Sequence, residues 1–140
     1  VDYPVFLDSE SAGGSGRADW LEADERTKVH KAFLETISAA GYETGVYGSR
    51  NWLNEQVNMK DLSDYKTWLA EYAEVPQYDA YYHMWQYTSK GTVDGIDTDV
   101  DLNLSYMNID TSINHAKGAE GYSGVIDGDS GNVPVGSDDE

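Results

Sequence analysis

The sequence predicts a single α/β domain in which helices separate the first strands of a partly parallel sheet. Three observations lead to this fold class. The chain has 140 residues, a length that suits one domain. Its hydrophobic content of 39% is enough for a core. The predicted elements run strand, helix, strand, helix and then three strands, and helices between strands indicate parallel pairing early in the chain.

The first predicted strand and helix are separated by a Gly/Ser-rich loop. Residues 5–7 form a short apolar run typical of a buried strand. Residues 9–17 read SESAGGSGR, a composition typical of a loop. In residues 23–40 apolar side chains recur at helical spacing, with Asp24 as an expected N-cap and Gly41 as the expected stop.

The remaining elements follow at short intervals. A short helical turn is expected between the second and third strands, and the last three strands show alternating side chains. In the fourth strand the alternation places Tyr81, His83, Trp85 and Tyr87 on one face. These predicted elements are residues 44–48 (strand), 51–57 (helical turn), 66–72 (strand), 81–88 (strand) and 100–104 (strand).

Composition excludes several classes of function. The net charge is −17, with 26 acidic against 9 basic residues, which argues against neutralising the phosphates of a nucleic acid. No apolar run is long enough to span a membrane. Without cysteine the chain has no disulfides or thiolate metal sites. Its 11 Tyr and 4 Trp, against 2 Phe, suit stacking on sugar rings.

Asp8 and Glu10 are the first candidate catalytic pair. They stand two residues apart at the carboxyl end of the first strand, so they project from the same face. Active sites of α/β sheets and barrels lie at that end. Two carboxylates so close cannot both ionise freely, which provides a proton donor beside a carboxylate, as glycoside hydrolysis requires. The alternative is that both residues simply end the strand in solvent.

A second acidic cluster, DGIDTDVD at residues 94–101, could bind Ca²⁺. It lacks the glycine and terminal glutamate positions of an EF-hand, so residues 91–97 are predicted to be a solvated loop. Asp101 differs because it alternates with apolar strand residues, and we expect it to face the same side as Asp8 and Glu10. His83 is predicted to be packed, and no pair of histidines has metal-ligand spacing.

Four segments together resemble the glycoside hydrolase family 25 lysozymes, the Chalaropsis-type N-acetylmuramidases. They are YPVFLDSE, GVYGSRNWL, WLAEY and WQYTSKGTVDGIDTDVDLN, in order and at similar spacing over residues 1–106. Thr98 stands where the family usually has glycine. The resemblance implies an irregular, flattened TIM-like β/α barrel, of which residues 1–117 would form the C-terminal half. It also implies cleavage of the β-1,4 bond between N-acetylmuramic acid and N-acetylglucosamine in bacterial peptidoglycan.

The same resemblance implies roles for individual residues. Glu10 matches the general acid and Asp8 its carboxylate partner. Asp101 matches an acidic residue that lines the same site. Four aromatic residues match positions around the substrate groove, and core packing is the alternative for each of them, above all for Trp85. The implied substrate-binding residues are Tyr47, Trp68, Tyr72 and Trp85. The resemblance implies no metal or organic cofactor.

Partners and location follow from the resemblance as well. The expected partners are peptidoglycan glycan strands, with no nucleic acid and no membrane, and the expected location is extracellular or in the cell wall. Residues 118–140 are expected to be an acidic Gly/Ser-rich tail or linker. The half-barrel is expected to associate with the missing N-terminal half or as a homodimer, with its first and last strands at the edges. Alternatives are a non-catalytic glycan-binding half-domain and an inert half-domain that pairs with another chain.

Overall fold

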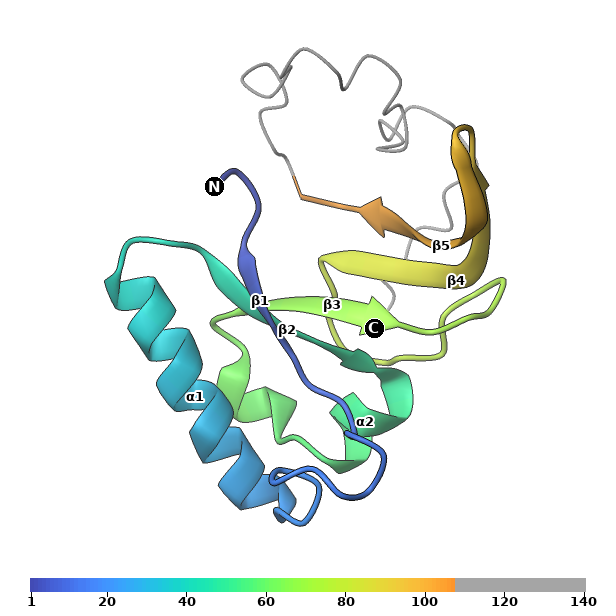
Figure 1. The fold of residues 1–140 in the computed structure, drawn as a ribbon. Helices are drawn as coiled ribbons and strands as arrows, with labels where there is room; N and C mark the ends of the chain where they lie inside the picture. The colour runs from blue at the N-terminus through green and yellow to red at the C-terminus, as the bar shows by residue number, and fades with distance from the viewer. Residues whose placement is uncertain (108–140) are drawn as a thin grey trace.

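The computed structural model describes residues 1–107 of the chain, and the predicted tail at residues 118–140 lies outside this range. No helix within residues 1–107 is long and apolar enough to cross a bilayer. The elements follow the predicted order, with one additional 3₁₀ helix (Figure 1). They are β1 (Val5–Asp8), α1 (Ala23–Ala39), β2 (Thr44–Ser49), α2 (Arg50–Glu55), the 3₁₀ helix η1 (Met59–Leu62), β3 (Lys66–Ala70), β4 (Met84–Val93) and β5 (Ile96–Ser105).

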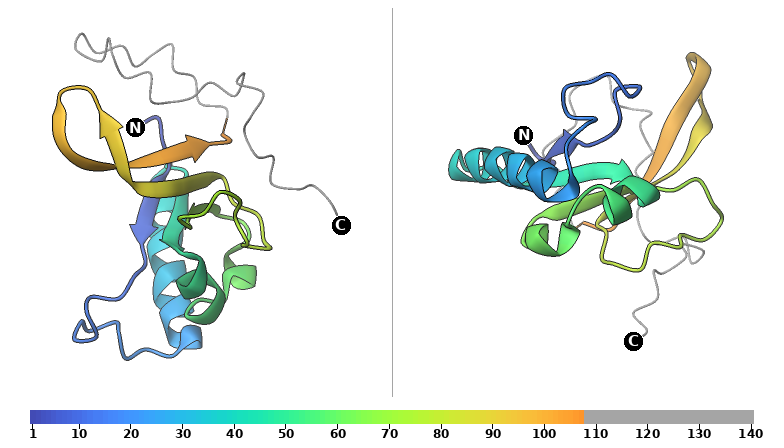
Figure 2. Two further views of the ribbon diagram at one scale, coloured as in Figure 1. Left: turned by 90° about the vertical axis from the view of Figure 1, so that its right-hand side faces the viewer. Right: turned by 90° about the horizontal axis from the view of Figure 1, so that it is seen from below.

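The five described strands form one sheet in chain order, β1-β2-β3-β4-β5. Strands β1 to β4 pair in parallel, and β5 runs antiparallel to β4. The predicted parallel pairing of the early strands is therefore confirmed. Within the described residues, β1 and β5 are the outermost strands, as predicted. The long β4–β5 hairpin curls away from the first three strands, so the sheet is strongly bent (Figure 2).

The helices cover one face of this sheet and build the core there. Val46 of β2 and Leu69 of β3 are fully buried against Leu34 of α1. Leu53 of α2 and Leu62 of η1 complete the same cluster. Alternate side chains along a strand point to opposite faces, so the neighbours of these core residues point to the other, inner face of the bent sheet.

The predicted helix is confirmed almost to the residue, and its C-terminal stop has a clear cause. Gly41 follows α1 with a φ of 90°, a conformation that glycine adopts without strain. The predicted N-cap is wrong, because Glu22 precedes the first helical residue and Asp24 lies in the first turn. Asp24 instead accepts a hydrogen bond from Asn58 at 2.5 Å, which joins α1 to the start of η1.

Two predicted boundaries near the end of the chain are wrong. Residues 81–83 precede β4, which begins only at Met84. Residues 91–97, predicted as a solvated loop, lie mostly in β4 and β5, which meet at a tight turn through Asp94 and Gly95. Gly95 has a φ of 87°, and an Asp-Gly pair is a preferred sequence for such hairpin turns.

Candidate active site

Residues that sequence analysis selected independently lie next to one another on the inner face of the sheet. Asp8 of β1 is in register with Tyr47 of β2, which is in register with Trp68 of β3. Two residues further along, Ala70 pairs with Gln86, and Gln86 pairs with Asn103. A continuous band of inner-face side chains therefore crosses the sheet from β1 to β5, near the carboxyl ends of the parallel strands.

Tyr47 marks the centre of this band. The pKa of its hydroxyl is raised to about 12, chiefly by burial and then by Tyr72 and the charges of Asp8, Glu10 and Asp101. The three predicted catalytic carboxylates thus lie close enough to one phenol to act on it together. All three are exposed, so they are accessible to a ligand. Tyr47 itself remains a neutral hydrogen-bond donor at every pH well below 12.

A buried amide fixes the two tyrosines of the site. Gln86 is 3% exposed, and its Oε1 accepts hydrogen bonds from the hydroxyls of Tyr47 at 2.9 Å and Tyr72 at 2.8 Å. The indole N–H of Trp68 donates to Oδ1 of Asn103 at 2.8 Å. The ring of Tyr47 meets that of Trp68 edge-on with centroids 4.8 Å apart. Sequence analysis missed Gln86 and Asn103, although both alternate with apolar residues in their strands.

Comparison with known proteins identifies the family. The model of the family described as "Glycosyl hydrolases family 25" matches residues 1–96. The chain belongs to glycosyl hydrolase family 25. A comparison with curated proteins gives no match. The predicted family is thus confirmed on more than half of the chain.

Solved structures resemble this family 25 chain over part of their length. The CTP1L endolysin is 31% identical with a TM-score of 0.53, covering 70% of this chain and 33% of its own. The autolysin LytC of Streptococcus pneumoniae is 28% identical with a TM-score of 0.63, covering 74% of this chain and 26% of its own. A bacterial lysozyme from Streptomyces coelicolor shares the fold at 20% identity and a TM-score of 0.56, covering 71% and 48%.

This family 25 chain therefore spans less than half the length of each of these structures. Its curled sheet with helices on one face is part of an irregular TIM-like barrel, as predicted. In such barrels the carboxyl ends of the strands carry the active site. The band of side chains around Tyr47 lies at this end.

Trp85, predicted to line the substrate site, lies on the other side of the family 25 sheet. It is 3% exposed within the core cluster, and its indole N–H donates to the carbonyl oxygen of Glu71 at 2.8 Å. Its neighbour Gln86 takes the inner-face position. Core packing, the alternative reading for this tryptophan, is what the structure shows, whereas Tyr47, Trp68 and Tyr72 belong to the inner face.

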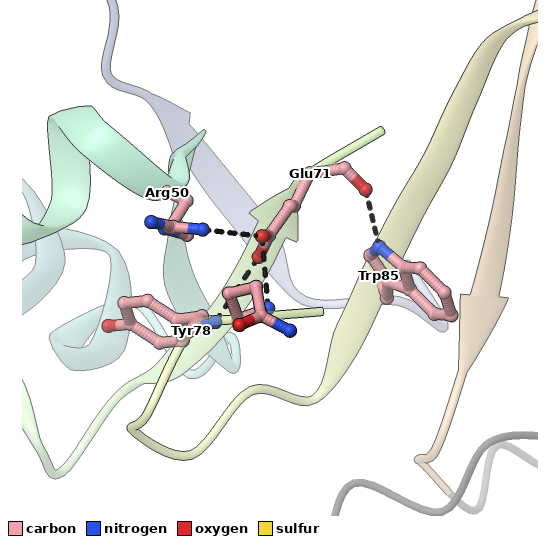
Figure 3. Close-up of polar contacts among 5 residues, drawn as sticks. Arg50, Glu71, Tyr78 and Trp85 are labelled. Atoms are coloured by element: carbon pink, nitrogen blue, oxygen red, sulfur yellow. Dashed lines mark hydrogen bonds and ion pairs between the residues drawn. The ribbon is translucent and has the colours of Figure 1, made fainter. Parts of the chain in front are cut away.

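The carboxylate of Glu71 holds the loop that follows β3 through its contacts with Arg50 and Tyr78 (Figure 3). One carboxylate oxygen lies 2.9 Å from Nη1 of Arg50 and also accepts the backbone N–H of Gln77 at 2.9 Å. The other oxygen accepts the backbone N–H of Tyr78 at 3.2 Å. Sequence reasoning missed this role. The signal was available, because Glu71 shares a face of the predicted strand with the apolar Leu69.

The acids of the second cluster are spread along the hairpin rather than gathered. Asp94 lies in the turn, while Asp97 and Asp99 are exposed on β5. Within residues 1–107 no group of three or more His, Asp or Glu side chains is arranged to hold a metal ion. Of this segment only Asp101 lies near enough to act on the Tyr47 hydroxyl.

Proposed function

We propose that the complete protein containing this chain is a muramidase that hydrolyses the β-1,4 bond between N-acetylmuramic acid and N-acetylglucosamine in peptidoglycan. The observation that carries the proposal is that Asp8 lies in register with Tyr47 at the carboxyl end of a family 25 barrel sheet, where the charges of Glu10 and Asp101 act on the same phenol. Glycoside hydrolysis needs two carboxyl groups, one to protonate the leaving oxygen and one to stabilise positive charge at the anomeric carbon.

In this proposal Glu10 is the general acid. Its proton passes to the glycosidic oxygen while the bond from that oxygen to the anomeric carbon breaks. Asp8 stabilises the positive charge that develops on the sugar, and Asp101 lines the same site. A water molecule then supplies a hydroxyl group to the anomeric carbon, and its remaining proton restores the acid. In this proposal neither a metal nor an organic cofactor takes part in the reaction.

The aromatic side chains of the inner face provide the surface for the sugar rings. Tyr47, Trp68 and Tyr72 are held by hydrogen bonds and ring contacts, so they present rigid faces at low entropic cost. A LytC structure is described as a complex with a synthetic peptidoglycan ligand, which is consistent with a glycan ligand in this family. Because peptidoglycan is a wall polymer, we place the activity outside the cell, at the cell wall.

We further propose that strands from outside residues 1–107 complete the barrel, supplied by a further segment or by a second copy. The main-chain groups on the free sides of β1 and β5 would otherwise lack partners, which favours association. Light scattering of the isolated 140-residue chain is expected to show a mass above 15.5 kDa. A well-folded monomer of that mass with full lytic activity would contradict the requirement for a partner.

The proposed reaction is tested on purified peptidoglycan with the chain in its complete natural protein. We expect release of muropeptides whose new reducing ends are N-acetylmuramic acid, identified by borohydride reduction and mass spectrometry. New reducing ends at N-acetylglucosamine would assign the other glycosidic bond. Binding to the wall without any new reducing ends would favour a glycan-binding module over an enzyme.

A further inference from the structure

We propose that Ser9, Trp52 and His30 form a positioning cluster that holds Asp8 and Glu10 in place from the helix-covered face of the sheet. The inference rests on the catalytic roles proposed above. Ser9 is the residue between the two carboxylates, and alternation along the chain points its side chain away from theirs. It is only 4% exposed, whereas both acids are exposed. The short segment therefore presents two acids on one side and is anchored on the other.

Three hydrogen bonds anchor Ser9. Its Oγ accepts the indole N–H of Trp52 at 2.8 Å and lies 3.2 Å from Nε2 of His30. Its backbone N–H donates to the carbonyl oxygen of Tyr47 at 2.9 Å, which extends the β1–β2 pairing one residue beyond the end of β1. The partners come from α1, α2 and β2, so three separate elements converge on the residue between the proposed acid and its partner.

The donor and acceptor roles around Ser9 are mutually consistent. An indole N–H can only donate, so Ser9 Oγ accepts from Trp52. Burial, assisted by the positive charge of Arg26, lowers the pKa of His30 to about 4. The imidazole is therefore neutral near pH 7, so one of its ring nitrogens can accept a hydrogen bond and the other can donate one. In either tautomer Nε2 of His30 forms a hydrogen bond with the Ser9 hydroxyl, as acceptor or as donor, in addition to the bond from Trp52.

The tryptophan of the cluster is itself held in place. The guanidinium of Arg26, 2% exposed, lies 4.7 Å from the centre of the Trp52 ring. Arg26 donates to the carbonyl and side-chain oxygens of Gln56 at 2.9 and 3.0 Å and to the carbonyl oxygen of Ala18 at 2.8 Å. At the start of α2, Ser49 accepts the backbone N–H of Trp52. The indole N–H therefore has little freedom to move away from Ser9.

Such rigidity matters because proton transfer and charge stabilisation depend on placement. A displacement of about 1 Å in a reacting group can cost roughly 100-fold in rate. Ser9→Ala removes the central hydroxyl. Trp52→Phe removes only the N–H bond and keeps an aromatic ring beneath Arg26. In the complete protein we expect each variant to lower kcat about 10- to 100-fold, with KM within about twofold, because the sugar-binding face is unchanged.

Thr44→Val is the matched control. Thr44 is also 4% exposed, and its hydroxyl donates to the carbonyl oxygen of Val5 at 2.6 Å, so this change removes a buried hydroxyl bond to the far end of β1. We expect Thr44→Val to lower the melting temperature about as much as Ser9→Ala while keeping kcat within about twofold. The kcat of the double variant with Ser9→Ala and Trp52→Phe should be no lower than about half that of the slower single variant, because both changes remove the same hydrogen bond.

The outcomes separate this inference from the proposed function. If the wild-type protein cleaves peptidoglycan and the folded Ser9→Ala and Trp52→Phe variants keep its kcat, the positioning cluster is refuted and the function stands. A loss of kcat in Thr44→Val equal to that in Ser9→Ala also refutes it, since any loosening of β1 would then suffice. If Ser9→Ala does not fold, Trp52→Phe alone decides. A wild-type protein without hydrolytic activity refutes the proposed function itself.

Discussion

Glu10→Gln is expected to lower kcat on peptidoglycan by roughly 10²- to 10⁴-fold while leaving fold and glycan binding intact. The range is that of a lost general acid in a positioned site. Glutamine keeps the shape of the side chain but has no proton to give to the leaving oxygen. Glu10 is exposed beyond the end of β1, and its charge acts on Tyr47 within the inner-face band, so no core packing is disturbed. Hydrolysis is measured as the formation of new reducing ends.

A substrate with an activated leaving group makes this test specific. A dinitrophenyl glycoside of the muropeptide sugar leaves as a stable anion and needs little protonation, so Glu10→Gln should be only slightly impaired on it. Glu55→Gln, the same change at an exposed acid at the end of α2, is the control and should keep wild-type rates. Wild-type clearing of cell walls by Glu10→Gln would exclude the proposed acid.

The regular elements could be predicted because local signals and long-range packing agree. The helix predicted at residues 23–40 spans Ala23–Ala39, and Gly41 ends it. Its apolar spacing predicts the helix but not the whole buried face, because Leu34 and His30 are buried whereas Val29 is exposed. The short apolar run of β1 and the second strand were located for the same reason. Val46 of the second strand is fully buried, whereas the apolar residues of β1 are only half-buried.

The β4–β5 hairpin was predicted poorly because exposed strands leave little pattern. Asp97 and Asp99 are both exposed, and the outer part of β5 is held by main-chain pairing to β4 rather than by a buried face. The irregular register between the two strands weakens the alternation further. Only the Asp94–Gly95 pair signals the turn, and within this acidic stretch the same pair is equally typical of a loop.

The site was predicted in part, and its supporting contacts were not. Asp8, Glu10 and Tyr47 were selected from motifs, and the parallel register brings them together. The face of Trp85 could not be read from alternation, because aromatic and apolar residues occupy both faces of its strand. The hydrogen bond from Trp52 to Ser9 joins positions 43 residues apart in the sequence, a pairing that follows only from the fold.

Asp8→Asn is expected to be nearly as severe as Glu10→Gln on peptidoglycan, with a different signature. Asparagine keeps the size of the side chain but removes the negative charge that the proposal places beside the developing positive charge at the anomeric carbon. Losing one group that stabilises transition-state charge costs roughly 10²- to 10³-fold in kcat. The positive charge develops whatever the leaving group. The defect should therefore persist on the activated glycoside, on which the Glu10→Gln variant is expected to regain most of its activity.

One further measurement on Asp8→Asn, with Asp99→Asn as its control, separates a lost charge from a disturbed site. The negative charge of Asp8 contributes to the raised pKa of Tyr47, so the variant should lower this pKa from about 12 toward the ordinary value near 10 in a tyrosine absorbance titration. Asp99→Asn removes an exposed charge two positions before Asp101 and should change neither rate nor titration. If Asp8→Asn recovers on the activated glycoside as fully as Glu10→Gln does, the two carboxylates share one function. In that case Asp8 serves proton delivery rather than the stabilisation of positive charge.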